Sequence, residues 1–105
     1  MDSLSYRLFF KAVSNPTRTE IIRLLKKKPC NVTEICSSLG FEQSRVSHNL
    51  KCLVDCGFLS ARWKKGMRVY SLNGNVRPIL NSIDKHIISY HNELIKCGIL
   101  KGGKT

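Results

Sequence analysis

Residues 31–58 carry two apolar patterns of helical period separated by a glycine, and this arrangement constrains the fold most. The first pattern runs from Asn31, a residue favoured at helix N-caps, to Gly40, a residue favoured at helix ends. Glu34 follows Asn31 by three residues, which is the spacing of a capping box. The second pattern begins after a short turn and stops at Gly57. Two helices joined by a short glycine-containing turn form a helix-turn-helix, so the spacing predicts that motif.

The second of these helices is amphipathic. On a wheel of about 100° per residue its apolar side chains gather in one sector: Val46, Leu50, Leu53 and Val54. The opposite side includes Ser47, His48 and Lys51, whose side-chain types suit phosphates and base edges in a DNA major groove. For an isolated helix, a solvated polar face would be the simpler interpretation. The preceding helix and the glycine turn favour DNA reading instead.

Further helices are predicted on both sides of this motif within a single domain, residues 1–105. Residues 3–13 place apolar side chains on one helical face, and Asn15 followed by Pro16 predicts the start of another helix. Residues 76–97 carry apolar side chains at alternating spacings of four and three, the seam with which a helix packs on another helix. We expect a mainly α fold in which the terminal helices, 3–13 and 76–97, pair two copies of the chain.

Two short alternating runs around Lys64-Lys65-Gly66 predict a β-hairpin within residues 59–73. Its tip is basic, and we expect it to meet the DNA backbone or the minor groove through Arg62, Lys64, Lys65 and Arg68. Such contacts determine position and salt dependence more than sequence preference. Trp63 and Tyr70 are expected to brace the loop.

The charge of the chain agrees with a nucleic-acid partner. Lysine and arginine number 18 against 7 acidic residues, a formal net charge of +11 over 105 residues. Such a charge favours a polyanionic partner, although a solubilising surface would give the same count. The sequence has neither a membrane-spanning apolar run nor a secretory signal, so we expect a cytoplasmic protein without a membrane partner. It also has no nucleophile–base constellation and no phosphate-binding glycine loop, so we do not expect an enzyme.

The order of these motifs resembles that of ArsR/SmtB-family repressors. The stretches that carry the resemblance, within residues 5–97, are Asn15-Pro16-Thr17-Arg18, 32–39, 44–51, 57–59 and 66–72. The resemblance implies a homodimeric winged helix-turn-helix protein that binds palindromic operator DNA and releases it when a ligand binds. The implied DNA contacts in the second helix are Ser44, Arg45, Ser47, His48, Asn49 and Lys51. One departure is that the family usually has histidine directly before Leu50, where this chain has Asn49.

Five cysteines without an export signal argue against a disulfide framework and leave metal binding, redox sensing and burial open. Cys52 and Cys56 lie one helical turn apart in the second helix, so both sulfurs can share one ion. Their spacing resembles that of CmtR-type cadmium/lead sensors, in which a third cysteine comes from the C-terminal region of the partner subunit. This resemblance implies Cys97 as the third ligand and Cd(II) or Pb(II) as the effector, with Zn(II) as an abundant competitor.

Two alternatives remain open. Cys52, Cys56 and Cys97 could instead serve a thiol redox or persulfide switch, or pack inertly in a DNA-binding module that has no effector. We interpret Cys36 as a core residue and Cys30 as a spare thiol.

Two other site patterns of the family are incomplete in this sequence. The C-x-C motif of the first helix is absent, because Asn31 and Thr33 occupy its places. Asp84-Lys85-His86 matches the first half of a zinc site on the last helix. Its second half would fall at Cys97 and Leu100, and leucine cannot coordinate a metal. We therefore do not expect a complete zinc site of that type.

Overall fold

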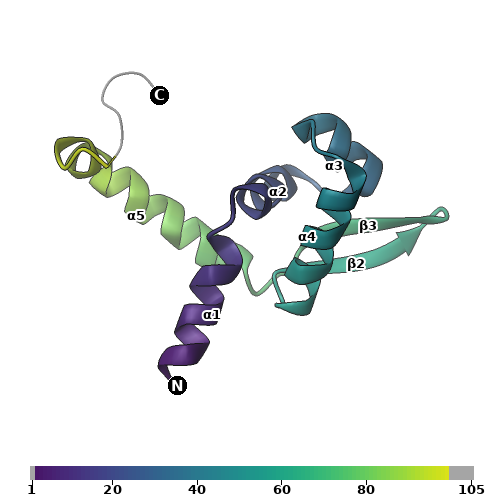
Figure 1. Ribbon diagram of the computed structural model, residues 1–105, viewed down its shortest axis with the longest axis horizontal. Helices are drawn as coiled ribbons and strands as arrows, with labels where there is room; N and C mark the ends of the chain where they lie inside the picture. The colour runs from purple at the N-terminus through teal and green to yellow at the C-terminus, as the bar shows by residue number, and fades with distance from the viewer. Residues whose placement is uncertain (1, 100–105) are drawn as a thin grey trace. The chain divides into compact units, whose positions relative to one another are not determined.

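The computed structural model describes residues 2–99 (Figure 1). The chain divides into two compact units, and the boundary in the sequence falls between Asn73 and Gly74. Met1 and residues 100–105 of the predicted domain lie outside the described residues. The first unit contains α1 (Ser3–Val13), α2 (Pro16–Lys27), β1 (Cys30–Asn31), α3 (Val32–Leu39), α4 (Gln43–Asp55), β2 (Leu59–Lys64) and β3 (Met67–Leu72). The second unit contains α5 (Arg77–Lys96). Within residues 2–99, no helix has the length and apolar character needed to cross a membrane.

The predicted helix-turn-helix is confirmed, with α3 and α4 as its two helices. The capping box of α3 is complete, because the Asn31 side chain accepts the Glu34 backbone N–H at 2.8 Å. In return, the Glu34 carboxylate accepts the Asn31 backbone N–H at 2.9 Å. Gly40 ends α3 in the left-handed region, at a φ of +71°, where a side chain would be strained. The chain then turns, and α4 begins at Gln43.

The core of the first unit lies where α2, α3 and α4 meet the sheet. The predicted apolar face of α4 is confirmed at Val46, Leu50 and Leu53, which are at most 1% exposed, whereas Val54 at its edge is half-buried. Other buried apolar side chains of this core come from α2, α3, the turn after α4 and the sheet: Ile21, Leu25, Ile35, Phe58, Leu59 and Leu72. Full burial of such a side chain stabilises a fold by about 1.5–3 kcal/mol. Burial of these side chains therefore determines which residues of α4 face the solvent.

The predicted hairpin is confirmed, with β2 and β3 paired antiparallel from Leu59↔Leu72 to Lys64↔Met67. The two residues between the strands both have positive φ, +52° at Lys65 and +78° at Gly66, as a tight I′-type turn requires. A third strand, β1, pairs with β3 and makes the sheet order β1-β3-β2. The strand β1 was not predicted, because a strand of two residues cannot show an alternating pattern.

The roles predicted for Cys30 and Cys36 are wrong. Cys30 is the core residue, only 1% exposed, whereas Cys36 on α3 is half-buried. The reason is the unpredicted strand β1, which pairs Cys30 with Tyr70 and places the Cys30 side chain in the core. Removal from water raises the pKa of the Cys30 thiol above its ordinary value.

Two helices keep apolar side chains on their surfaces. In α1, four large side chains are 54–58% exposed: Leu4, Tyr6, Leu8 and Phe10. In α5, no residue from 77 to 96 is buried. Three side chains of the predicted seam on α5 are 39–51% exposed: Ile83, Ile87 and Tyr90. Monomeric soluble proteins rarely expose apolar stripes of this kind, so both helices carry surface suited to a partner.

Candidate nucleic-acid interface and thiol site

The outward face of α4 is polar and open to solvent. It presents Ser44, Ser47, His48 and Lys51, all of which are exposed. The Lys51 ammonium lies 3.1 Å from the Asp55 carboxylate, one helical turn further on. Because both side chains are mostly exposed, this ion pair contributes little stability, and Lys51 remains able to turn toward a phosphate.

Arg45, another predicted DNA contact, is exposed but anchored. Its Nε donates a hydrogen bond of 2.7 Å to the Thr17 hydroxyl at the start of α2. Its guanidinium carbon also lies 3.9 Å from the centre of the Phe41 ring, a cation–π contact. These two contacts position the guanidinium next to the N-terminal end of α4.

Asn49 lies on the inner side of α4, unlike the other predicted contacts in that helix. It is 7% exposed, and its side-chain oxygen accepts a hydrogen bond of 2.9 Å from Arg18 Nε. Its side-chain nitrogen donates to the Arg45 backbone carbonyl, also at 2.9 Å. Arg18 in turn donates to the Ala12 carbonyl at 3.3 Å, at the end of α1. Because both ends of the amide are engaged, we assign Asn49 to holding α4 against α1 and α2.

The β2–β3 hairpin, or wing, carries the second group of predicted DNA contacts. All four are exposed: Arg62, Lys64, Lys65 and Arg68. A shallow hollow between α4 and the wing is lined by Ser47 and Lys51 from one side and by Arg68 and Tyr70 from the other. The outward face of α4 and the wing therefore form one continuous basic surface within the first unit.

The two aromatic residues predicted to brace the wing differ in how far their side chains are exposed. Tyr70 is 7% exposed and does support it. Trp63 is 74% exposed, so the expectation that it braces the loop is wrong. The reason is its place at the far end of β2, beyond the part of the sheet that the helices cover.

The predicted thiol ligands on α4 lie at its C-terminal end. Cys52 is half-buried, and its Sγ lies 4.0 Å from Nε2 of His48. Cys56 is exposed and caps the helix. Gly57 follows with a φ of +82°, and the Phe58 N–H bonds back to the Leu53 carbonyl at 2.9 Å. This Schellman motif fixes the backbone at Cys56.

Cys97, the third predicted ligand, has the same local setting at the end of α5. It is exposed and caps the helix, and Gly98 follows it with a φ of +74°. The Ile99 N–H bonds back to the Leu94 carbonyl at 3.0 Å, which completes a second Schellman motif.

The two thiols at the C-terminal end of α4 do not make a metal site by themselves. Among residues 2–99, no group of three or more histidine, cysteine, aspartate or glutamate side chains could hold a metal ion. Cys52 and Cys56 supply at most two sulfur donors from one helix, so any further donor has to come from outside this set. On α5, the His86 and Tyr90 rings contact each other at a tilt of 37°, with centroids 4.6 Å apart.

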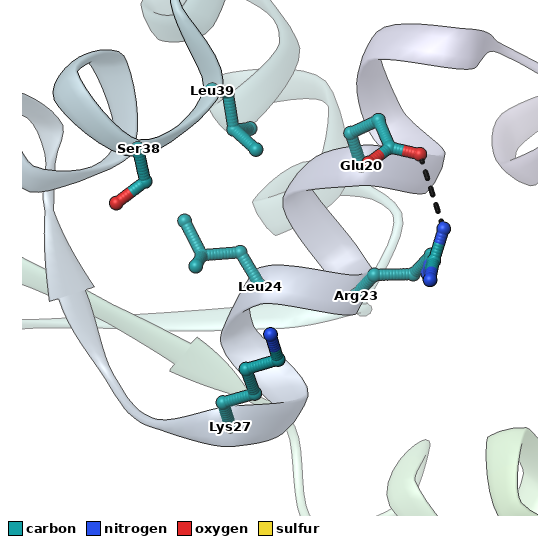
Figure 2. A pocket seen from close by; sticks show the side chains of 6 residues that line it. All are labelled: Glu20, Arg23, Leu24, Lys27, Ser38 and Leu39. Atoms are coloured by element: carbon teal, nitrogen blue, oxygen red, sulfur yellow. Dashed lines mark hydrogen bonds and ion pairs between the residues drawn. The ribbon is translucent and has the colours of Figure 1, made fainter.

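A separate hollow lies between α2 and α3 (Figure 2). It is lined by Glu20, Arg23, Leu24, Lys27, Ser38 and Leu39. The Arg23 guanidinium lies 3.5 Å from the Glu20 carboxylate on the rim. None of the lining residues is a cysteine or a histidine, so this hollow does not suit a thiophilic metal.

The fold and the basic surface define a winged helix-turn-helix protein. Over residues 15–61, from the N-cap of α2 into β2, the chain matches the family model described as bacterial regulatory protein, arsR family. It is 32% identical over 89 residues to the transcriptional regulator NmtR of Mycobacterium tuberculosis, a match covering 85% of this chain and 71% of NmtR. The chain therefore belongs to the arsR family, whose members are DNA-binding transcriptional regulators and not enzymes.

Two further relatives match a shorter part of the chain. A probable mercury resistance operon repressor of Streptomyces lividans is 41% identical over 54 residues, which are 51% of this chain and 43% of that repressor. The regulator CmtR of Mycobacterium bovis is 32% identical over 62 residues, 59% of this chain and 52% of CmtR. This chain thus spans about half the length of these two relatives or less.

Solved structures agree with the fold. The crystal structure of Rv0081 of M. tuberculosis has a TM-score of 0.74 and 27% sequence identity. The similarity covers 89% of this chain and 96% of that one. The predicted winged helix-turn-helix class, mainly α with a small β-hairpin wing, is confirmed.

Proposed function

We propose that two copies of this chain form a repressor that holds operator DNA and releases it when a thiophilic metal ion binds. The ligands are Cys52 and Cys56 of one copy and Cys97 of the other. One observation carries the proposal: a cysteine pair lies at the end of the DNA-reading helix, and among residues 2–99 it is not part of a group of three or more side chains that could hold a metal ion. A second copy is the simplest source of a third donor.

The position of the cysteines at helix ends suits a cation. Cys56 and Cys97 each cap the C-terminal end of a helix, and Cys52 lies one turn before the end of α4. The helix dipole places partial negative charge at a C-terminus, where it attracts cations. Because Schellman motifs hold both cap residues, their sulfur atoms start from defined backbone positions.

Metal binding would change both the geometry and the charge of the DNA-reading surface. A shared ion ties α5 of one copy to α4 of the other, so the spacing of the two reading helices differs from the spacing that fits DNA. Three neutral thiols also lose three protons when they bind one divalent ion, which leaves a complex with a net charge of −1. That charge lies on the helix that faces phosphates. Metal and operator therefore weaken each other's binding reciprocally.

The uncovered faces of α1 and α5 support the dimer. Their exposed apolar side chains are the surface that a second copy would cover. In a two-fold dimer, the two α4 helices enter the major groove at half-sites about 34–36 Å apart, one turn of DNA. DNA selected from a random pool should therefore show inverted repeats at that spacing.

Sulfur-only ligation favours soft cations, so we propose Cd(II) or Pb(II) as the effector, with Zn(II) as the competing ion. The likeness to a probable mercury resistance repressor supports a soft metal. We place the protein in the cytoplasm, where operator DNA is present and thiols stay reduced.

The test is a cadmium titration of the reduced protein, with DNA selected from a random-sequence pool by binding to the wild-type chain. Thiolate-to-metal absorption and the anisotropy of the labelled, selected duplex are followed together. Wild type and the matched control Cys36→Ser should bind cadmium and release the duplex at the same metal concentration. Cys97→Ser should bind the duplex but fail to release it.

The alternatives predict different results in the same assay. A redox switch predicts release by an oxidant without metal, reversed by a dithiol. A module without an effector predicts unchanged DNA affinity under both treatments. Either result in place of metal-dependent release contradicts the proposal.

A further inference from the structure

Trp63 is an exposed tryptophan on a basic hairpin. It is 74% exposed, near the end of β2, and it is the only tryptophan of the chain. A large aromatic side chain left in water is a recurring feature of binding surfaces, because its burial on a partner is strongly favourable. Nothing in the core explains why this position carries an indole.

The strand register shows on which face of the wing Trp63 lies. Alternate residues of a strand share one face, so Trp63 shares its face with Leu59 on β2. Directly across on β3 stands Arg68, and two residues further on that strand is Tyr70. Leu59 and Tyr70 are buried, whereas Trp63 and Arg68 extend the same face beyond the core.

This face is continuous with the DNA-reading helix. Arg68 and Tyr70 line the hollow that contains Ser47 and Lys51 of α4. They also line a second hollow, together with Trp63. A partner that lies along α4 and passes over Arg68 therefore reaches the indole.

The charge around Trp63 identifies the chemistry of that partner. The wing carries four exposed cationic side chains near the indole: Arg62, Lys64, Lys65 and Arg68. A negatively charged polymer with flat or apolar surfaces between its charges is complementary to this pattern. Double-stranded DNA fits, because phosphates flank a minor groove whose walls are sugars and base edges.

We infer that Trp63 contacts operator DNA and packs its indole into the minor groove beside the major-groove segment read by α4. The cations around it hold the flanking phosphates. The inference rests on the proposed function only in taking DNA as the partner, and it does not require a metal. The contact adds a preference for base steps that open easily, at positions that α4 does not touch.

Because Trp63 is the only tryptophan, its fluorescence reports on this contact alone. The selected duplex is added to metal-free protein while tryptophan emission, its quenching by acrylamide and the anisotropy of labelled DNA are recorded. DNA binding should change the emission and protect the indole from acrylamide. Trp63→Ala should weaken binding by roughly tenfold, the scale of one lost base–aromatic contact. Trp63→Phe should keep most of the affinity.

Ser60→Ala is the matched control. Ser60 is a half-buried residue of the same wing, and the strand alternation places it on the other face from Trp63. It lines neither of the two hollows that contain Arg68 and Tyr70. It should leave DNA affinity and tryptophan protection unchanged. Because Trp63 is so exposed, Trp63→Ala should also unfold at the wild-type temperature.

Three outcomes overturn the inference. The first is saturated DNA binding with unchanged tryptophan emission and quenching, together with wild-type affinity of Trp63→Ala. The second is protection of the indole at high protein concentration without DNA, which assigns it to a second copy. The third is the same protection by anionic phospholipid vesicles. None of these three results bears on the proposal of metal-dependent DNA release. Absence of any DNA binding contradicts both that proposal and the inference about Trp63.

Discussion

The contact between Arg18 and Asn49 should hold the DNA-reading helix in place. In the described residues, every buried side-chain nitrogen and oxygen has a hydrogen-bond partner, and Asn49 uses both ends of its amide. Asn49→Ala removes a bond to a charged guanidinium, worth about 1.5–3 kcal/mol, and a bond to a backbone carbonyl, worth about 1 kcal/mol. Arg18 keeps its contact with the Ala12 carbonyl, which softens the loss. We expect the free energy of unfolding to fall by about 2–3 kcal/mol.

Urea unfolding at one fixed protein concentration measures this loss, since the stability of a dimer depends on concentration. A double-mutant cycle with Arg18→Ala should give a coupling energy of about 1 kcal/mol or more between the two side chains. Ser44→Ala, an exposed change on the same helix, should stay within about 0.5 kcal/mol of wild type. If Asn49→Ala is as stable as wild type and shows no coupling to Arg18, the assignment of Asn49 as a positioning residue is refuted.

Three further outcomes are expected. Lys64→Ala combined with Lys65→Ala should weaken binding to all DNA sequences and reduce its salt dependence; an unchanged salt slope would count against the wing as a phosphate contact. His48→Ala should alter the preference among selected duplexes, whereas uniform weakening would mean that it reads no base. The buried Cys30 thiol, whose pKa is raised, contributes stability that is present below its unfolded pKa and lost as pH rises through the folded one. Cys30→Ala should therefore flatten the alkaline fall in unfolding free energy measured by urea.

Local signals made most of the fold predictable. The capping box at Asn31 and Glu34, the glycine at position 40 and the Lys65-Gly66 turn each restrict a few backbone angles, and the structure has them all. Amphipathic spacing then identified the buried face of α4, because an apolar side of a helix has to be covered.

The misses at Cys30 and Asn49 share one cause, since each residue's place depends on a contact distant in sequence. Cys30 is buried because β1 pairs with β3, some forty residues later in the chain. Asn49 lies on the inner side of α4, where its side-chain oxygen accepts a hydrogen bond from Arg18, 31 residues away in the sequence. The only sequence signal for Asn49 was that it stands where the family usually has histidine.

Neither a local sequence pattern nor a single chain supplies all the ligands of the proposed thiol site. One-turn spacing was enough to predict that Cys52 and Cys56 share a helix end. A third ligand contributed by another molecule leaves no trace in local spacing, so its identity rests on resemblance. It has to be tested with two chains.

Complementation between variant chains tests the shared site most directly. One chain carries Cys52→Ser and Cys56→Ser, and the other carries Cys97→Ser. Neither alone should release the selected duplex with cadmium, but mixed dimers should regain one complete site, with thiolate-to-metal absorption and DNA release at about half the wild-type metal content. If both pure variants fail and the mixed dimers also fail, although they form and bind DNA, the ligands do not come from two subunits. The central claim is then contradicted.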